Sequence, residues 1–341
     1  MRSQCCLFVD AGYLLASVAT RLTRTSLRSG VRVDFTELIP GLIEQAERAC
    51  QLPLLRINWY DAARNALPDR DQEAIGSLSR VKVRLGRIGF NGEQKGVDLR
   101  IGLDMVAQAR NGAVDVIFLV SGDDDLSEAV EEAQAHGVLV KILAVPDSDG
   151  AAHAVSEHLL RASDGIELVD SEILDRTVVR VVVKPTPATI PRPGPRPSAV
   201  PGGPGMAAGK AESVMRLPLR PGGPFAPGVG RGPLPRPAES TLAYRSETGA
   251  KSTMGAEYAL EDADVVEAIR HVISGVIDSF LASAADEERA EVLSAEPYIR
   301  PDLDRALLLD LAHRLTSLDL SDHIRYALRS QFWEALKQSV G

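Results

Sequence analysis

Residues 5–18 read CCLFVDAGYLLASV, and they contain the transition that decides the fold. The apolar residues 5–9 predict a strand that is buried on both faces, and the spacing of the apolar residues from Leu14 onward is typical of an amphipathic helix. Asp10 lies between the two. Because an unpaired buried carboxylate costs several kcal/mol, we expect Asp10 to be solvated, to cap the helix or to bind a ligand.

The same alternation of short apolar runs and helical segments continues to about residue 170. This order predicts an α/β fold with a mostly parallel sheet and helices on both of its faces. Strands are expected at residues 5–9, 54–60, 81–85, 114–120 and 138–145, and helices at residues 14–27, 35–50, 72–79, 97–110, 126–136 and 151–162.

The composition of the 341-residue chain changes twice after this region. Residues 184–245 are rich in Pro, Gly and Arg and have a net charge of +7, whereas residues 1–183 and 251–341 have net charges of −7 and −8. A Pro/Gly-rich stretch of this kind predicts a disordered linker. Helical periodicity then returns and predicts helices at about 262–284, 301–315 and 321–339. We therefore expect an α/β domain (1–175), a basic linker (184–245) and a small all-α domain (255–341).

Cysteine and histidine patterns speak against several classes of protein. The three cysteines form no C-x-x-C pair, which favours a reducing compartment. His153 and His158 are five residues apart, off a common helix face, so the sequence predicts no zinc site. No apolar segment approaches the length of a transmembrane helix. These observations predict a soluble, cytoplasmic protein.

Further carboxylates follow the predicted strands and begin the predicted helices. Asp123, Asp124 and Asp125 come directly after the strand at 114–120, and Asp98 is in the first turn of the helix at 97–110. Loops at the carboxyl ends of parallel strands converge in an open α/β sheet. Oxygen ligands suit hard cations such as Mg²⁺ or Mn²⁺, so a metal site is one interpretation. Helix capping is the other, although three consecutive aspartates exceed what a cap needs.

Three other residues are weaker candidates. Asp104 lies six positions after Asp98, about 120° further around the helix, and is a second choice as a metal ligand. Ser121, at a turn between strand and helix, is a candidate to bind a phosphate oxygen. Lys95 is a candidate to neutralise a substrate. The competing interpretations are a simple turn residue for Ser121 and a solvated side chain for Lys95.

Three segments together resemble a known family. LFVDAGYL, KGVDLRIGLDMV and FLVSGDDDLSEAVEEAQAHGVLVKIL are similar, in the same order, to the three acidic motifs of the NYN domain, a branch of the PIN-like ribonuclease superfamily. The resemblance covers about residues 3–170. Many members have an asparagine three residues after the first aspartate, where this chain has Tyr13.

This resemblance implies a PIN-like three-layer α/β/α sandwich and a metal-dependent ribonuclease that hydrolyses RNA phosphodiester bonds with Mg²⁺ or Mn²⁺. Carried over by position, it implies that Asp10, Asp98, Asp123 and Asp125 are catalytic metal ligands, with Asp104 as a further ligand. The expected partner is RNA, in single-stranded form, and the arginines of the basic linker are expected to hold its backbone.

Three other classes of protein with acidic sites fit the sequence less well. A haloacid-dehalogenase-like phosphatase requires a second acid at position 12, which is Gly12 here, and the acidic patterns of toprim and receiver domains are also missing. The open alternative is a non-catalytic PIN-like scaffold that binds RNA or metal and acts through its C-terminal helices. The broad apolar face of the first of those helices favours a homo-oligomer or a protein partner.

Overall fold

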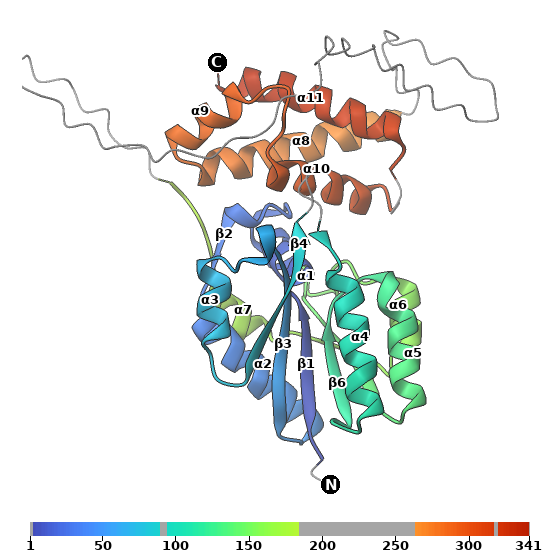
Figure 1. Ribbon diagram of the computed structural model, residues 1–341. Coiled ribbons are helices and arrows are strands. Elements are labelled where there is room, and N and C mark those ends of the chain that lie inside the picture. Colours follow the sequence, from blue (N-terminus) through green and yellow to red (C-terminus); the bar gives the residue numbers. More distant parts are fainter. Residues whose placement is uncertain (1–2, 89–93, 184–262, 317–319, 341) are drawn as a thin grey trace, which may run out of the picture. The chain divides into compact units, whose positions relative to one another are not determined.

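The strand predicted at residues 5–9 is β1 (Cys5–Asp10), and it lies in the interior of a seven-stranded sheet (Figure 1). The computed structural model describes residues 3–88, 94–183, 263–316 and 320–340, so the predicted linker lies outside the described residues. The strand order is β5-β4-β3-β1-β6-β7-β8. The other strands of this sheet are β3 (Leu54–Ala63), β4 (Val81–Ile88), β5 (Gln94–Lys95), β6 (Val116–Val120), β7 (Leu139–Ala144) and β8 (Ile166–Leu168).

Six of these strands are parallel, and only the short β5 runs antiparallel to its neighbour β4. A second, small antiparallel sheet pairs β2 (Val31–Val33) with β9 (Val178–Arg180). The helices of the α/β region are α1 (Ala11–Thr23), α2 (Phe35–Cys50), α3 (Arg70–Gly76), α4 (Val97–Arg110), α5 (Ser127–Ala135), α6 (Glu157–Ala162) and α7 (Ser171–Thr177). The predicted α/β class with a mostly parallel sheet is confirmed.

Successive side chains of β1 point to opposite faces of the sheet and belong to two hydrophobic clusters. Cys5, Leu7 and Val9 face a cluster that includes side chains of α1, α2 and α7, whereas Cys6 and Phe8 face α4, α5 and α6. All five side chains are fully buried. The continuous apolar run is therefore explained by a strand that has helices on both sides, which makes three layers.

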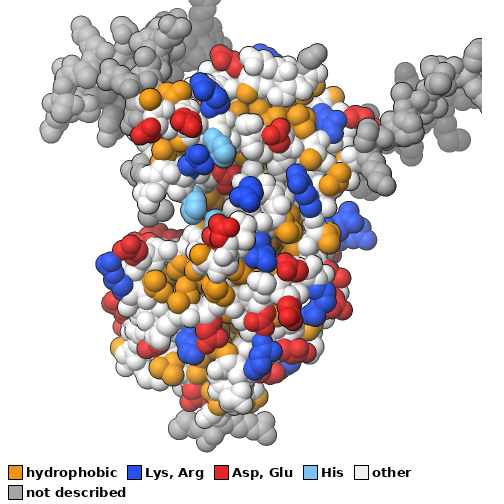
Figure 2. All heavy atoms as spheres, turned by 180° about the vertical axis from the view of Figure 1, so that it is seen from behind, with side chains coloured by type: hydrophobic (Ala, Val, Ile, Leu, Met, Phe, Trp, Pro, Cys, Tyr) orange, Lys and Arg blue, Asp and Glu red, His pale blue; other side chains and the backbone are white. Residues whose placement is uncertain are grey.

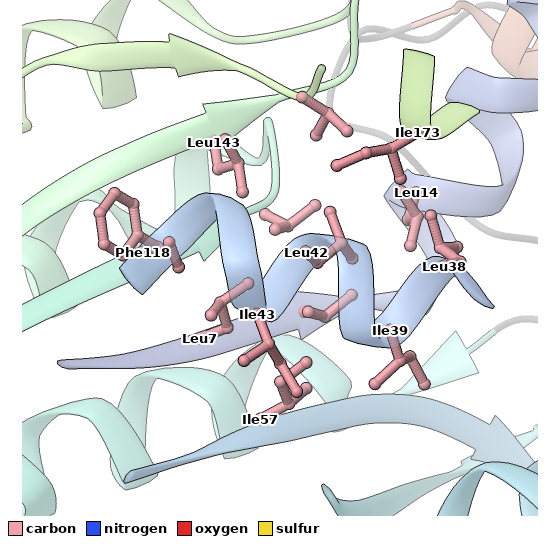
Figure 3. Close-up of a cluster of buried hydrophobic side chains, with 14 of the residues drawn as sticks. Leu7, Leu14, Leu38, Ile39, Leu42, Ile43, Ile57, Phe118, Leu143 and Ile173 are labelled. Atoms are coloured by element: carbon pink, nitrogen blue, oxygen red, sulfur yellow. The ribbon is translucent and has the colours of Figure 1, made fainter. Parts of the chain in front are cut away.

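Helix α2 shows how one face is packed. Its residues Leu38, Ile39, Leu42 and Ile43 recur at the spacing of one helix face and are buried in the same cluster as Leu7, Ile57 and Phe118 of the sheet (Figure 3). Asp34 caps this helix by accepting a hydrogen bond from the Thr36 amide at 3.0 Å. Burial of this face stabilises the helix although Pro40 lies within it.

The C-terminal residues form helices with a hydrophobic cluster of their own. They are α8 (Ala263–Ser283), α9 (Asp286–Ser294), α10 (Pro301–Arg314) and α11 (Asp322–Val340). Leu27, from the loop after α1, is fully buried in this cluster. The Ser26 amide donates hydrogen bonds to both carboxylate oxygens of Asp310, at 3.0 and 3.2 Å. No helix in the described part of the chain combines the length and apolar character needed to cross a membrane.

Some elements differ from the sequence prediction. The helix expected at 151–162 begins only at Glu157, because Ser156 caps it by accepting a hydrogen bond from the Leu159 amide at 3.0 Å. The helix expected at 14–27 ends at Thr23, and Arg24 follows in a left-handed conformation with φ 62°. Elements β2, β5, β8, β9, α7 and α9 were not predicted. Each has no more than nine residues, too few for a clear periodicity.

Candidate active site

Two of the predicted aspartates follow neighbouring parallel strands. Asp10 ends β1, and Asp123 lies in the loop after β6, whose Val120 is paired with Val9. The sheet order reverses between these two strands, since the chain passes from β1 to β3 and β4 on one side and later to β6, β7 and β8 on the other. Ligands of open α/β sheets bind outside the carboxyl ends of the strands at such a switch point.

Asp10 has a capping role and also belongs to an electrostatic cluster. Its Oδ1 accepts a hydrogen bond of 2.7 Å from the Gly12 amide, which caps α1, and the residue is only 8% exposed. Burial and, next, the negative charge of Asp98 raise the pKa of Asp10 to about 6, against the opposing effect of the Tyr13 amide and Arg28. Capping and ligand binding are therefore compatible at this residue.

The negative charge of Asp98 acts on both Asp10 and Asp123. It occupies the first turn of α4, directly after the turn at Gly96, where φ is 74°. Burial raises the pKa of Asp123, and the charges of Asp98, Asp125 and Asp124 raise it further. The Asp98 charge thus acts on both other carboxylates, and we call these three residues the carboxylate cluster (Asp10, Asp98 and Asp123).

The other predicted acids have different surroundings. Asp104 forms an ion pair of 2.9 Å with Arg84 and accepts a hydrogen bond of 3.0 Å from the Tyr60 hydroxyl. Asp125 is exposed, and its amide donates to Asp123 Oδ1 at 3.3 Å. The structure thus places Asp104 in a separate polar contact on α4, as its position about 120° from Asp98 on the helix would suggest.

The two candidate phosphate ligands are also in different places. Ser121 is fully buried, and its Oγ accepts a hydrogen bond of 3.3 Å from the Asp123 amide. This contact positions the Asp123 loop. Lys95 is exposed on β5, at the start of the turn that leads to Asp98.

Three charged residues near the carboxylate cluster were missed by the sequence analysis. Asp61 lies on β3, one residue beyond the partner of Asp10 in the sheet. Burial lowers the pKa of Arg28 to about 10, and the charge of Arg305 lowers it further, while Asp61 and Asp10 oppose this effect. Burial likewise lowers the pKa of Arg305, on α10, against the charges of Asp10, Asp61 and Asp98. A signal existed for Asp61, because it follows the predicted strand 54–60 as Asp10 follows 5–9.

Tyr13 packs beside the Asp123 loop and is fixed by two hydrogen bonds of its hydroxyl group. Its hydroxyl donates a hydrogen bond of 2.8 Å to the carbonyl oxygen of His153 and accepts one of 3.3 Å from the Val145 amide. The tyrosine ring also lies beside Gly122, directly before Asp123. Tyr13 therefore connects the loop after β7 with the Asp123 loop.

The donor set of the carboxylate cluster fits a hard divalent cation. Its side chains offer only oxygen ligands, and the negative charge of Asp98 near Asp10 and Asp123 makes a nearby cation favourable. Within the described ranges, no three His, Cys, Asp or Glu side chains are already gathered as a metal site. Mg²⁺ does not require three gathered protein ligands, because it commonly binds through one or two carboxylates together with waters and substrate phosphates.

Asp10→Asn is expected to stabilise the metal-free protein at neutral pH. A pKa of about 6, above the ordinary value of 3.8, means that the native state binds the proton more tightly than the unfolded state does. Ionised Asp10 therefore lowers stability above about pH 6, and this effect vanishes below about pH 4. Since asparagine caps a helix about as well as aspartate, the substitution should raise the melting temperature by several degrees at about pH 7.5 and have little effect at about pH 4.

Asp34→Asn is the matched control for thermal melts in EDTA. Asp34 also caps a helix, but it is exposed and its hydrogen bond from the Thr36 side chain lowers its pKa. This lowered pKa contributes stability at neutral pH that is lost as the pH falls through it. Asp34→Asn should therefore be neutral or slightly destabilising at neutral pH. A loss of stability for both variants would contradict the electrostatic account of Asp10.

Comparison with known proteins relates the α/β region of the chain to one family. Residues 5–170 match the model of the NYN domain. The chain is 41% identical over 81 residues to the uncharacterized protein y4oD of Sinorhizobium fredii, and this match covers 24% of the chain and 38% of that protein. It is also similar to a solved structure, the protein of unknown function VPA0982 from Vibrio parahaemolyticus, with a TM-score of 0.36 and 22% identity over 52% of this chain and 97% of that one.

Proposed function

Residues 5–170 of this chain form an NYN domain, which belongs to a PIN-like nuclease family, and from this premise we propose that the protein is a metal-dependent ribonuclease. In this proposal the carboxylate cluster holds Mg²⁺ or Mn²⁺, with Asp125 as a further ligand, and the substrate is single-stranded RNA. The observation that carries the proposal is the placement of Asp10 and Asp123 at the carboxyl ends of the paired strands β1 and β6, with Asp98 on α4 close enough for its charge to act on both.

The chain's own residues prepare the site for a cation. The caps made by Asp10 and Asp123 orient their carboxylates, because the Gly12 and Asp125 amides donate to them at 2.7 and 3.3 Å. Arg28 is held by its own hydrogen bond of 3.0 Å to the Gly12 carbonyl oxygen, and its charge acts on Asp10. When bound, a hard divalent cation supplies Lewis acidity and a water nucleophile of lowered pKa.

Cation binding is expected to stabilise the protein and to activate RNA cleavage. Relief of repulsion within the carboxylate cluster favours the native state, and a ligand present at about 100 times its Kd adds about 2.7 kcal/mol. The full chain, stripped with EDTA and titrated with MnCl₂ or MgCl₂, should therefore show a rising melting temperature. A 5′-labelled single-stranded RNA should be cleaved over the same range of metal concentrations.

The two measurements separate the nuclease from the non-catalytic scaffold. A rise in melting temperature without cleavage of RNA would favour the scaffold, an alternative that fits the lack of a gathered three-ligand group among the described side chains. Cleavage that persists in EDTA would contradict the metal-dependent mechanism. KCl at matched ionic strength is the control, because it screens the carboxylates without offering a divalent cation.

A further inference from the structure

A cleft at the beginning of α4 is lined by several cations. It lies between β4, β5 and the beginning of α4, and its volume of about 1070 Å³ is near the upper end of the 300–1,000 Å³ usual for ligand pockets. We call it the basic cleft, because cations from β4, β5, α4 and the short 3-10 helix η2 (Arg64–Ala66) line it: Arg64, Arg84, Arg87, Lys95 and Arg100. From the sequence, basic binding residues were expected in the linker and at Lys95, whereas the four arginines are dispersed among acids along the chain.

The arginines of the basic cleft are only partly neutralised by carboxylates of the described residues. Asp104 is the one carboxylate among the described residues that line the cleft, and it is paired with Arg84 at 2.9 Å. Arg64, Arg87 and Arg100 are exposed, and none forms an ion pair with a carboxylate of the described residues. On the face shown in Figure 2, acidic and basic side chains are interspersed. A local excess of cations in an acidic domain fits a polyanionic ligand.

Apolar side chains share the cleft with these cations. Leu99 and Leu103 are one helical turn apart on α4 and are 66% and 62% exposed, and Tyr298 is 59% exposed. Residues four positions apart lie on the same helix face. Large exposed apolar groups between cations suit a chain that alternates phosphates with flat bases, as single-stranded nucleic acid does.

Helix α4 connects the basic cleft to the carboxylate cluster. Asp98 belongs to the cluster, and the next two residues, Leu99 and Arg100, line the cleft. A strand of RNA in the cleft would thus pass within one residue of a proposed metal ligand.

We propose that the basic cleft binds the phosphate backbone of single-stranded RNA and leads it to the carboxylate cluster. The inference rests on the proposed ribonuclease function for the identity of the polyanion. The evidence that the cleft binds a polyanion does not depend on that function and consists of the charge, size and apolar lining of the cleft. It can therefore be tested without catalysis.

The test is RNA binding by the full chain in EDTA, where metal-dependent cleavage cannot occur. A fluorescein-labelled oligouridylate is titrated at several salt concentrations, and anisotropy gives the binding constant. Arg87→Glu/Arg100→Glu should weaken binding by at least about tenfold. The double substitution should also reduce the slope of log K against log salt by about 0.7 for each phosphate that the variant no longer neutralises. Arg64→Glu is a second variant, on a different element of the same cleft.

The control is Arg161→Glu/Arg180→Glu, which changes the net charge by the same amount on exposed residues outside the cleft lining. Melting temperatures check that all variants are folded. Equal weakening in control and cleft variants, or parent-like binding and salt slope in the cleft variants, would overturn the inference. If the cleft variants lose binding but the parent never cleaves RNA with metal, the cleft stands and the nuclease function fails. If the parent cleaves RNA and the cleft variants bind RNA as the parent does, the nuclease function stands and the proposal for the cleft fails.

Discussion

Asp123→Asn is expected to reduce metal-dependent RNA cleavage by at least about 100-fold. Loss of a residue that only supports a metal ligand costs about 10- to 100-fold, and Asp123 is proposed as a ligand itself. Asparagine has nearly the same size but no charge, so one anionic ligand is lost while the shape of the loop is preserved. The Asp125 amide can still donate to the side-chain oxygen of the new asparagine. The measurement is the single-turnover cleavage rate of a labelled RNA across a titration of Mn²⁺.

Stability shows whether this loss reflects chemistry or folding. Burial and neighbouring negative charges raise the pKa of Asp123, so its ionised form is unfavourable in the metal-free protein at neutral pH. Asp123→Asn should therefore melt at the same temperature as the parent or higher in EDTA, and it should gain less from added Mn²⁺. Asp124→Asn is the neighbouring control, since Asp124 accepts a hydrogen bond of 2.7 Å from Ser156 Oγ. Retained cleavage with a large loss of stability would make Asp123 structural and defeat the nuclease proposal.

Gly122→Ala is expected to have the second large effect, on both stability and activity. A Cβ at this position would lie 1.8 Å from the carbonyl oxygen of Ala154 and 3.0 Å from Tyr13 Cε2. The backbone must move to relieve this overlap, and overpacking of this kind costs about 1–3 kcal/mol or more. Because Asp123 is the next residue, cleavage should also fall by about 100-fold if its carboxylate shifts by about 1 Å. Thermal melts and cleavage rates measure the two effects.

Gly76→Ala is the matched control for this substitution. Its Cβ would meet Val83 Cγ2 at 3.4 Å, an ordinary van der Waals contact, and Gly76 is the last residue of α3. We expect a change in stability within about 0.5 kcal/mol and parent-like cleavage. If Gly122→Ala behaves like Gly76→Ala, the close approach of the Ala154 and Asp123 loops is not required for the site.

Local patterns determined much of the α/β fold. The apolar run before Asp10 predicted β1, and the helices expected at 35–50 and 97–110 have the same bounds as α2 and α4. These elements could be predicted from the sequence because a strand buried on both faces needs a continuous apolar run, and an amphipathic helix needs a period of 3.6 residues. Asp10 and Asp123 could be grouped in advance because the carboxyl ends of parallel strands meet at one edge. Their assignment as metal ligands remains a prediction.

Only the tertiary structure decided which other charges join that edge. Asp61 follows the predicted strand 54–60 just as Asp10 follows the predicted strand 5–9, but its place near the cluster depends on the pairing of β3 with β1, which local periodicity does not specify. Arg28 and Arg305 are 277 positions apart in sequence, and yet the charge of Arg305 affects the pKa of Arg28. The basic cleft likewise combines residues between Arg64 and Asp104 with Tyr298 and Pro301. Charge counted along the chain averages over such residues, whereas an electrostatic field depends on distances in space, so only the folded chain reveals it.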